Sequence, residues 1–236
     1  MPARTLMLLM PLGMFGLFLI SVVVSIFRNK NRHQQLEKEA QSLGLTFSHW
    51  SETLSAAEIT TPFFLSGSAG FKNVITGSYA GMSVEVFDYS HTSGSGKNTT
   101  VTMQTVAVYK QNVDFPSFTL GPGGLVARLI NAVDHQNVEV TSDKEFLHHY
   151  SVRGNDKERI KALFSESLIS FVKQLDRNKA WHVEGVGQKL VIYRYSRQTK
   201  PSALKDFLQE TSSIAQSFFA YAGTPKSGAF SASSNR

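Results

Sequence analysis

The feature that most constrains this chain is an apolar segment close to its N-terminus. Residues 6–27 contain no charged side chain. An α-helix of this length, at about 1.5 Å per residue, is about 33 Å long, which matches a hydrocarbon core of about 30 Å. The sequence therefore predicts one transmembrane helix at 6–27 after a short flank at 1–5, with the lipid bilayer as the first expected partner.

Positive charge gathers on the C-terminal side of this segment, where Arg28, Lys30 and Arg32 follow one another closely. Because Lys and Arg mark the cytoplasmic flank of a membrane span, we expect a single-pass protein of the cell membrane whose main domain lies in the cytoplasm. A secretory signal peptide is the alternative. Its apolar region is usually shorter and ends at small residues, which residues 24–27 do not provide.

Charge and cysteine usage narrow the expected partners. The net charge is +6, and a second basic run lies between Lys189 and Lys205. Each cation near an anionic leaflet contributes about 1 kcal/mol, so Arg28, Lys30 and Arg32 are candidate contacts of anionic lipid headgroups. No recognised nucleic-acid motif accompanies the charge, so nucleic acid is not expected. The chain has no cysteine, which excludes disulfides and thiolate chemistry.

The rest of the chain predicts one α+β domain. Residues 28–44 form a polar, basic juxtamembrane helix that stops at Gly44, and residues 45–223 form the soluble domain. The Ser- and Gly-rich residues 224–236 predict a disordered tail. Runs of β-branched and aromatic residues predict a short strand at 46–50 and antiparallel strands at 71–79, 82–89 and 100–109.

The second half of the chain supplies the helices. Prolines and glycines predict a loop at 114–124, followed by a short helix at 125–133. Apolar residues at helical spacing predict one amphipathic helix over 156–175, and a last helix begins at Pro201. A glycine turn predicts a hairpin over 181–195. We expect the helices to pack on one face of the sheet.

A glycine-rich segment between two predicted strands contains Gly94-Ser95-Gly96-Lys97. A Walker A loop needs a glycine where this chain has His91 and a Ser or Thr where it has Asn98, and it leads from a strand into a helix. We therefore interpret the segment as a hairpin tip and expect no nucleotide or other cofactor. Lys97 stays among the candidate functional side chains.

Asp88 is the other candidate, because strict alternation from Met82 places it on a strand face that is otherwise apolar. A buried charge requires a partner, and His91, Lys97 and Gln104 are the candidates. The favoured interpretation is that Asp88 fixes the hairpin by bonding turn amides. The alternative is a catalytic carboxylate that acts with His91 or Lys97.

No catalytic or metal-binding set is assigned elsewhere. His148 and His149 are adjacent, so in a strand they would point to opposite faces, and the usual metal-ligand spacings do not occur near them. The Gly-x-Ser-x-Gly elbow of many hydrolases is also absent from the sequence. We therefore expect no metal.

Several short motifs resemble those of a group of uncharacterised, bacterial, single-pass membrane-anchored proteins that share a domain of unknown function. The motifs are Phe63-Phe64-Leu65, Phe87-Asp88-Tyr89, Gly94-Ser95-Gly96-Lys97, Gln104-Thr105-Val106 and Phe115-Pro116. The similarity spans about residues 40–222, with departures at His91 and Gly123. It implies a bacterial, anchored protein and brings no activity with it.

Two classes of function follow. The favoured hypothesis is a membrane-tethered, noncatalytic interaction or ligand-binding module on the cytoplasmic face, with a protein, lipid headgroup or small ligand as its partner. The alternative is a membrane-anchored, hydrolase-like enzyme that uses Asp88 with His91 or Lys97. The absence of clustered acids, histidines and nucleophiles favours the first, and the surroundings of Asp88 discriminate between them.

Overall fold

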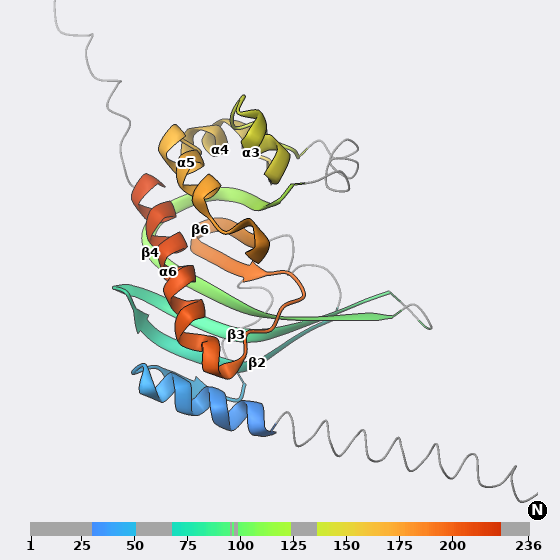
Figure 1. Cartoon of the computed structure of the whole chain (residues 1–236), viewed down its shortest axis with the longest axis vertical. Helices are drawn as coiled ribbons and strands as arrows, with labels where there is room; N and C mark the ends of the chain where they lie inside the picture. Colours follow the sequence, from blue (N-terminus) through green and yellow to red (C-terminus); the bar gives the residue numbers. More distant parts are fainter. Residues whose placement is uncertain (1–29, 51–67, 95, 97–98, 124–135, 223–236) are drawn as a thin grey trace, which may run out of the picture.

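The computed structural model describes residues 30–50, 68–94, 96, 99–123 and 136–222. They form an α+β fold in which helices cover an antiparallel sheet, so the predicted fold class is confirmed (Figure 1). No helix among these residues is both long enough and apolar enough to cross a membrane. The predicted transmembrane helix, the short helix at 125–133 and the C-terminal tail all lie outside the described residues.

The described chain starts with a helix over residues 30–42, within the predicted juxtamembrane segment. Leu36 and Ala40 are buried in the core of the domain. The helix stops as predicted at Gly44, whose φ of 71° is left-handed. The backbone amide of Leu45 reaches back to the carbonyl of Ala40 at 2.9 Å, as in a Schellman motif. The helix therefore packs on the domain.

Six described strands form the sheet: β1 (Thr46–Ser48), β2 (Ser68–Tyr79), β3 (Met82–Ser93), β4 (Thr100–Pro122), β5 (Tyr150–Gly154) and β6 (Trp181–Arg194). The first four follow one another as an antiparallel meander. Strand β4 is long enough to pair with β3 and then β5 along one edge, and with β6 along the other. β4 is thus the central strand that joins the two halves of the sheet.

Two predictions for this region were wrong. Residues 114–122 belong to β4 and not to a loop, because Phe115, Phe118 and Leu120 are buried in the core. Pro116 falls within a register shift against β6, where a strand tolerates a residue without an amide hydrogen. Residues 181–194 form one strand and not a hairpin, since Gly187, at φ 52°, continues β6 along β4.

The predicted helix over 156–175 is two helices, α4 (Lys157–Leu163) and α5 (Glu166–Gln174). The break comes at Phe164, whose ring turns into the core and lies 5.6 Å from that of Phe118. Ser165 then caps α5 by accepting a hydrogen bond from the amide of Leu168. Burial of one aromatic ring therefore outweighed continuation of the helix.

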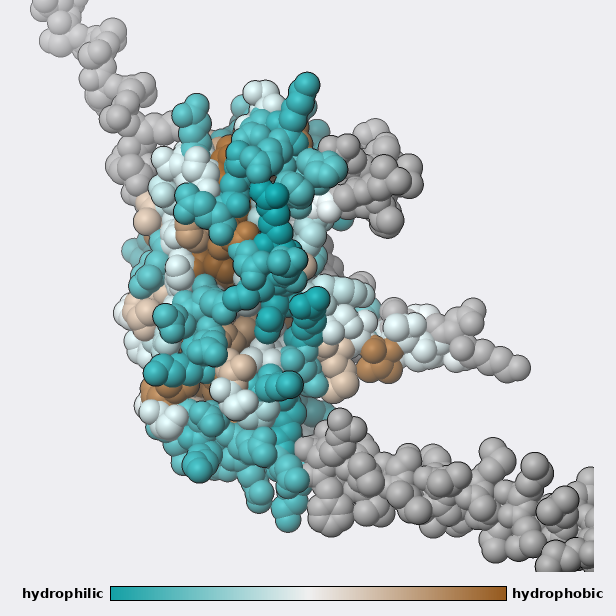
Figure 2. Space-filling model, in the orientation of Figure 1, coloured by the Kyte–Doolittle hydropathy of each residue, from teal (hydrophilic) through white to brown (hydrophobic). Residues whose placement is uncertain are grey.

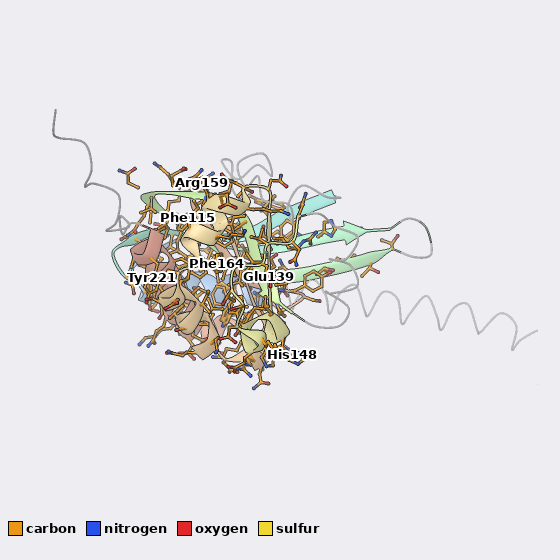
Figure 3. The ribbon with its side chains drawn as sticks, turned by 90° about the horizontal axis from the view of Figure 1, so that it is seen from above. Phe115, Glu139, His148, Arg159, Phe164 and Tyr221 are labelled. Carbon is orange, nitrogen blue, oxygen red and sulfur yellow. The ribbon has the colours of Figure 1, made fainter. Side chains whose placement is uncertain are left out.

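The sheet buries apolar residues on both faces. The larger cluster takes its members from helix 30–42, α3 (Lys144–His149), α4, α5 and α6 (Leu204–Ala222), so we call this the helical face. Phe115 and Phe164 lie inside this packing, while His148 and Arg159 lie at its periphery (Figure 3). The smaller cluster lies on the second face and consists of Val74, Phe87, Tyr89, Val106, Val108, Val191 and Tyr193.

Candidate functional site

Asp88 lies on the helical face of β3 and is only 6% exposed. Its partner is Arg32, from the helix that follows the predicted membrane span. Arg32 Nε donates to Asp88 Oδ2 at 2.8 Å, and Arg32 Nη2 donates to Asp88 Oδ1 at 2.7 Å. Such a bidentate pair is strong and directional, because the planar guanidinium matches the carboxylate.

Two further groups complete the coordination of the carboxylate. Asn73 Nδ2 donates to Asp88 Oδ2 at 2.7 Å, and Thr105 Oγ1 donates to Asp88 Oδ1 at 3.0 Å. Each carboxylate oxygen therefore accepts two hydrogen bonds, one from the guanidinium and one from the sheet. This arrangement replaces the water that the charge loses on burial.

The same network fixes the segment that follows β6. Arg32 Nη1 donates to the carbonyl of Thr199 at 2.9 Å, and the amide of Thr199 donates to Thr105 Oγ1 at 2.9 Å. We call these five residues, Arg32, Asn73, Asp88, Thr105 and Thr199, the clamp. The clamp joins three parts of the chain: helix 30–42, the sheet and the segment after β6.

Asn73 reaches the clamp because of a bulge in β2. The register of β2 against β3 shifts between Lys72 and Ile75, and Asn73 has a positive φ of 55°. Asn tolerates this left-handed conformation better than most residues, and a bulge redirects side chains. The Asn73 Oδ1 atom also contacts His33 Nδ1, so the bulge holds a second residue of helix 30–42.

A small cavity of about 100 Å³ lies beside the clamp. Its lining comes from helix 30–42, β2, β3, β4 and the segment after β6: Arg32, His33, Lys72, Asn73, Asp88, Tyr89, Ser90, Met103 and Gln198. Typical small-molecule sites measure about 300–1,000 Å³. This cavity is therefore too small for an ordinary substrate, and its only lining carboxylate is already bonded four times.

The structure does not bring Asp88 and His91 together. His91 lies on the second face, where its ring stacks with Tyr89 at 6.4 Å between centroids. Gln104 lies across from Tyr89 and is fully buried, and its Oε1 accepts from the amide of Ser196 at 3.1 Å. Asp88 thus contacts Thr105, which is next to Gln104, the partner that the sequence suggested.

The basic residues that the sequence suggested as lipid contacts or functional side chains also differ in their surroundings. Arg32, expected to contact lipid headgroups, is committed to Asp88, and its side chain is only 18% exposed. Lys30 is exposed at the start of the described helix. Arg28 and Lys97 lie outside the described residues. One sequence pattern could have revealed the inward direction of Arg32: it stands four residues before Leu36 and eight before Ala40, on one helical stripe.

A second polar cluster, which the sequence analysis missed, lies on the second face. Glu184 is 1% exposed and accepts a hydrogen bond from Tyr193 Oη at 2.5 Å. Burial, together with the charge of Glu184, raises the pKa of Tyr193 well above its ordinary value. The ring of His182 stacks on Tyr193 at 5.1 Å, and burial lowers the pKa of His182 to about 4.

A groove of about 500 Å³ lies between the end of α5 and the first half of α6. Its apolar lining is Phe171, Leu175, Trp181 and Ile214, and its charged lining is Asp176, Lys179, Asp206 and Glu210. Lys179 and Glu210 pair at 2.8 Å. Two carboxylates, Asp176 and Asp206, remain beyond that pair, so the groove is acidic on a chain whose net charge is +6.

Removal of either charged member of the clamp should destabilise the domain. Asp88→Ala and Arg32→Ala should each lower the free energy of unfolding by about 3 kcal/mol, because each leaves a buried charge without its partner. The variant that carries both substitutions should lose much less stability than the sum of the two single losses. Urea unfolding followed by circular dichroism measures these values. Lys161 and Glu158 form an exposed ion pair that serves as the control, and Lys161→Ala should change stability by less than about 0.5 kcal/mol. An Asp88→Asn variant more stable than the wild type would contradict a structural role.

His182 should make stability depend on pH. Its pKa is 6.5 when unperturbed and about 4 in the folded protein, so between these values the unfolded chain binds the extra proton. Stability should therefore fall as the pH falls from 6.5 to 4, by at most about 3 kcal/mol. His182→Phe keeps the stacked ring and should flatten this part of the pH profile. The exposed control His148→Gln should leave the profile unchanged, and an equal effect of both variants would refute the assignment.

Comparison with protein-family profiles and with curated protein sequences found no match. Among solved structures, the chain is similar to the crystal structure of the mycobacterial trehalose monomycolate transport factor A, TtfA. The TM-score is 0.54 at 12% sequence identity, and the match covers 82% of this chain and 98% of that one. At this identity the likeness shows that the two chains share a fold.

Proposed function

We propose that this chain is a noncatalytic binding module that segment 6–27 tethers to the cytoplasmic face of the membrane. The clamp is the observation that carries the proposal. An acid, base or nucleophile must be free to exchange protons or bonds with a substrate, whereas the carboxylate of Asp88 accepts four hydrogen bonds within the protein. The clamp instead joins the helix that follows the tether to the sheet, as a rigid support requires.

The groove between α5 and α6 is the surface on which we propose that a partner protein binds. Trp181 and Phe171 give it an aromatic floor, and aromatic residues are enriched where proteins bind one another. Its excess of carboxylates favours a cationic, amphipathic segment of the partner. An acidic groove on a chain of net positive charge would thereby orient such a partner.

The chain shares its fold with a protein named for transport. TtfA is described as a mycobacterial trehalose monomycolate transport factor. This chain shares the fold over 82% of its length. By extension we propose that this chain assists a transport process at the membrane, with its own partner and cargo.

A photo-crosslinking amino acid at Gln209, which lines the groove, should capture one discrete protein partner in living cells. Asp206→Lys in the same chain should abolish that product, because it reverses a charge of the groove. Gln188, which is exposed on β6 and outside the groove lining, is the matched control position and should give no such product. Equal products from both positions, or none from Gln209, would refute the groove as the binding surface.

A reporter fusion tests the proposed orientation of the membrane span. A reporter that is active only in the cytoplasm, fused after Arg236, should be active, because Arg28, Lys30 and Arg32 hold the C-terminal flank of segment 6–27 inside. A reporter that requires export should be silent at the same position. The reverse pattern would place the domain outside the cytoplasm and overturn the localisation.

A further inference from the structure

Four large hydrophobic side chains are exposed among the described residues. They are Trp50, Val101, Met103 and Tyr195, with exposed fractions of 66%, 59%, 46% and 53%. Single exposed apolar residues are common on protein surfaces and need no explanation. These four are notable because they gather at one end of the domain.

Contacts place three of them, Trp50, Val101 and Met103, close together. Lys72 Nζ lies 5.7 Å from the ring of Trp50, and Lys72 and Met103 line the same small cavity. Val101 is two residues before Met103 and therefore on the same side of β4. Tyr195 follows β6 at the same end of the sheet but on its second face, where its ring lies 6.4 Å from that of His182. Hydrophobic surface is visible on the projecting β3–β4 hairpin that carries Val101 and Met103 (Figure 2).

The charges at this end are positive. Lys30, Lys72, Arg197 and Lys200 are all exposed here. The segment with Arg197 and Lys200 is held close to the start of helix 30–42, because Arg32 donates to the carbonyl of Thr199 at 2.9 Å. The carboxylate of Asp88 is neutralised by Arg32. Two basic segments that are far apart in the sequence thus meet at one surface.

Chain length determines which end of the domain faces the bilayer. Three peptide units separate Phe27, the last residue of the apolar segment, from Lys30, and they span at most about 11 Å. The clamp fixes the helix that starts at Lys30 to the sheet. The start of that helix and the projecting hairpin lie on the same side of the molecule (Figure 1). When segment 6–27 crosses the membrane, this side has to lie at its surface.

We propose that this end of the domain, formed by Trp50, Lys72, Val101, Met103, Tyr195 and Arg197, rests in the headgroup region of an anionic bilayer. We call it the lipid-facing end. Trp and Tyr prefer the membrane interface, and Lys and Arg attract anionic headgroups. Val101 and Met103 at the hairpin enter the boundary of the acyl chains. The inference rests on the proposed tether and adds a second, noncovalent contact with lipid.

The absence of cysteine permits a direct test in the full-length chain. Val101→Cys and Met103→Cys would each carry a polarity-sensitive fluorophore, and the protein would be reconstituted into liposomes that contain phosphatidylglycerol. The control is Glu158→Cys, whose side chain is 88% exposed on α4, at the other end of the molecule (Figure 1). The two hairpin labels should shift to the blue and brighten several-fold, while the control label should not change.

The outcomes separate the lipid contact from the tether. Flotation of the liposomes first reports whether the chain is inserted. A chain that floats while the labels at 101 and 103 stay as water-exposed as the control overturns the lipid-facing end and leaves the tether standing. A chain that fails to float overturns both. A blue shift that appears only after a partner protein is added would identify a protein interface instead. Lys72→Glu with Arg197→Glu should weaken the response in anionic liposomes, and an undiminished response would contradict the role of charge.

Discussion

The ion pair between Arg32 and Asp88 is the interaction on which the rest of this structure depends. Strand β3 places a carboxylate among apolar neighbours, where an unpaired charge would cost several kcal/mol, on the order of the whole stability of a domain. Its cation comes from a helix 56 residues away in the sequence. The pair therefore stabilises the sheet only when helix 30–42 is docked, and it couples the order of that helix to the order of the domain.

This coupling bears on the proposed membrane tether. A tether that ended in a flexible linker would let the domain turn freely. Here only a few residues separate the apolar segment from a helix that Leu36, Ala40 and the clamp hold on the sheet. With the proposed tether the domain would have one orientation, with Lys72, Trp50 and the hairpin toward lipid and the acidic groove available to a partner. Rigid presentation is a physical advantage for a module that acts by binding, because less freedom is lost when the partner docks.

The fold class and most of the meander could be predicted from the sequence, because the two faces of a strand differ in burial and this difference appears as alternation of apolar and polar residues. It failed where tertiary packing decided the outcome. The prolines around 116 suggested a loop, yet Phe115 and Phe118 required a strand there, and Phe164 broke a helix that its periodicity had favoured. At the site, alternation correctly placed Asp88 on the apolar face. Its partner Arg32 could not be deduced, because a pairing across 56 residues depends on the packed fold. Its partner on β4 was misplaced by one residue, from Thr105 to Gln104, and a shift of one residue moves a side chain to the other face of the sheet.

Hydrogen exchange of the backbone amides, residue by residue, tests the central claim most directly. If the clamp holds helix 30–42 to the sheet, the amides of residues 36–42 should be protected nearly as strongly as those of β3. Arg32→Ala should then remove the protection of the helix amides, while the amides of β3 and β4 should lose only about 3 kcal/mol of protection, the loss expected for the domain as a whole. Rapid exchange of these helix amides in the wild-type chain, or protection that Arg32→Ala leaves unchanged, would contradict the account.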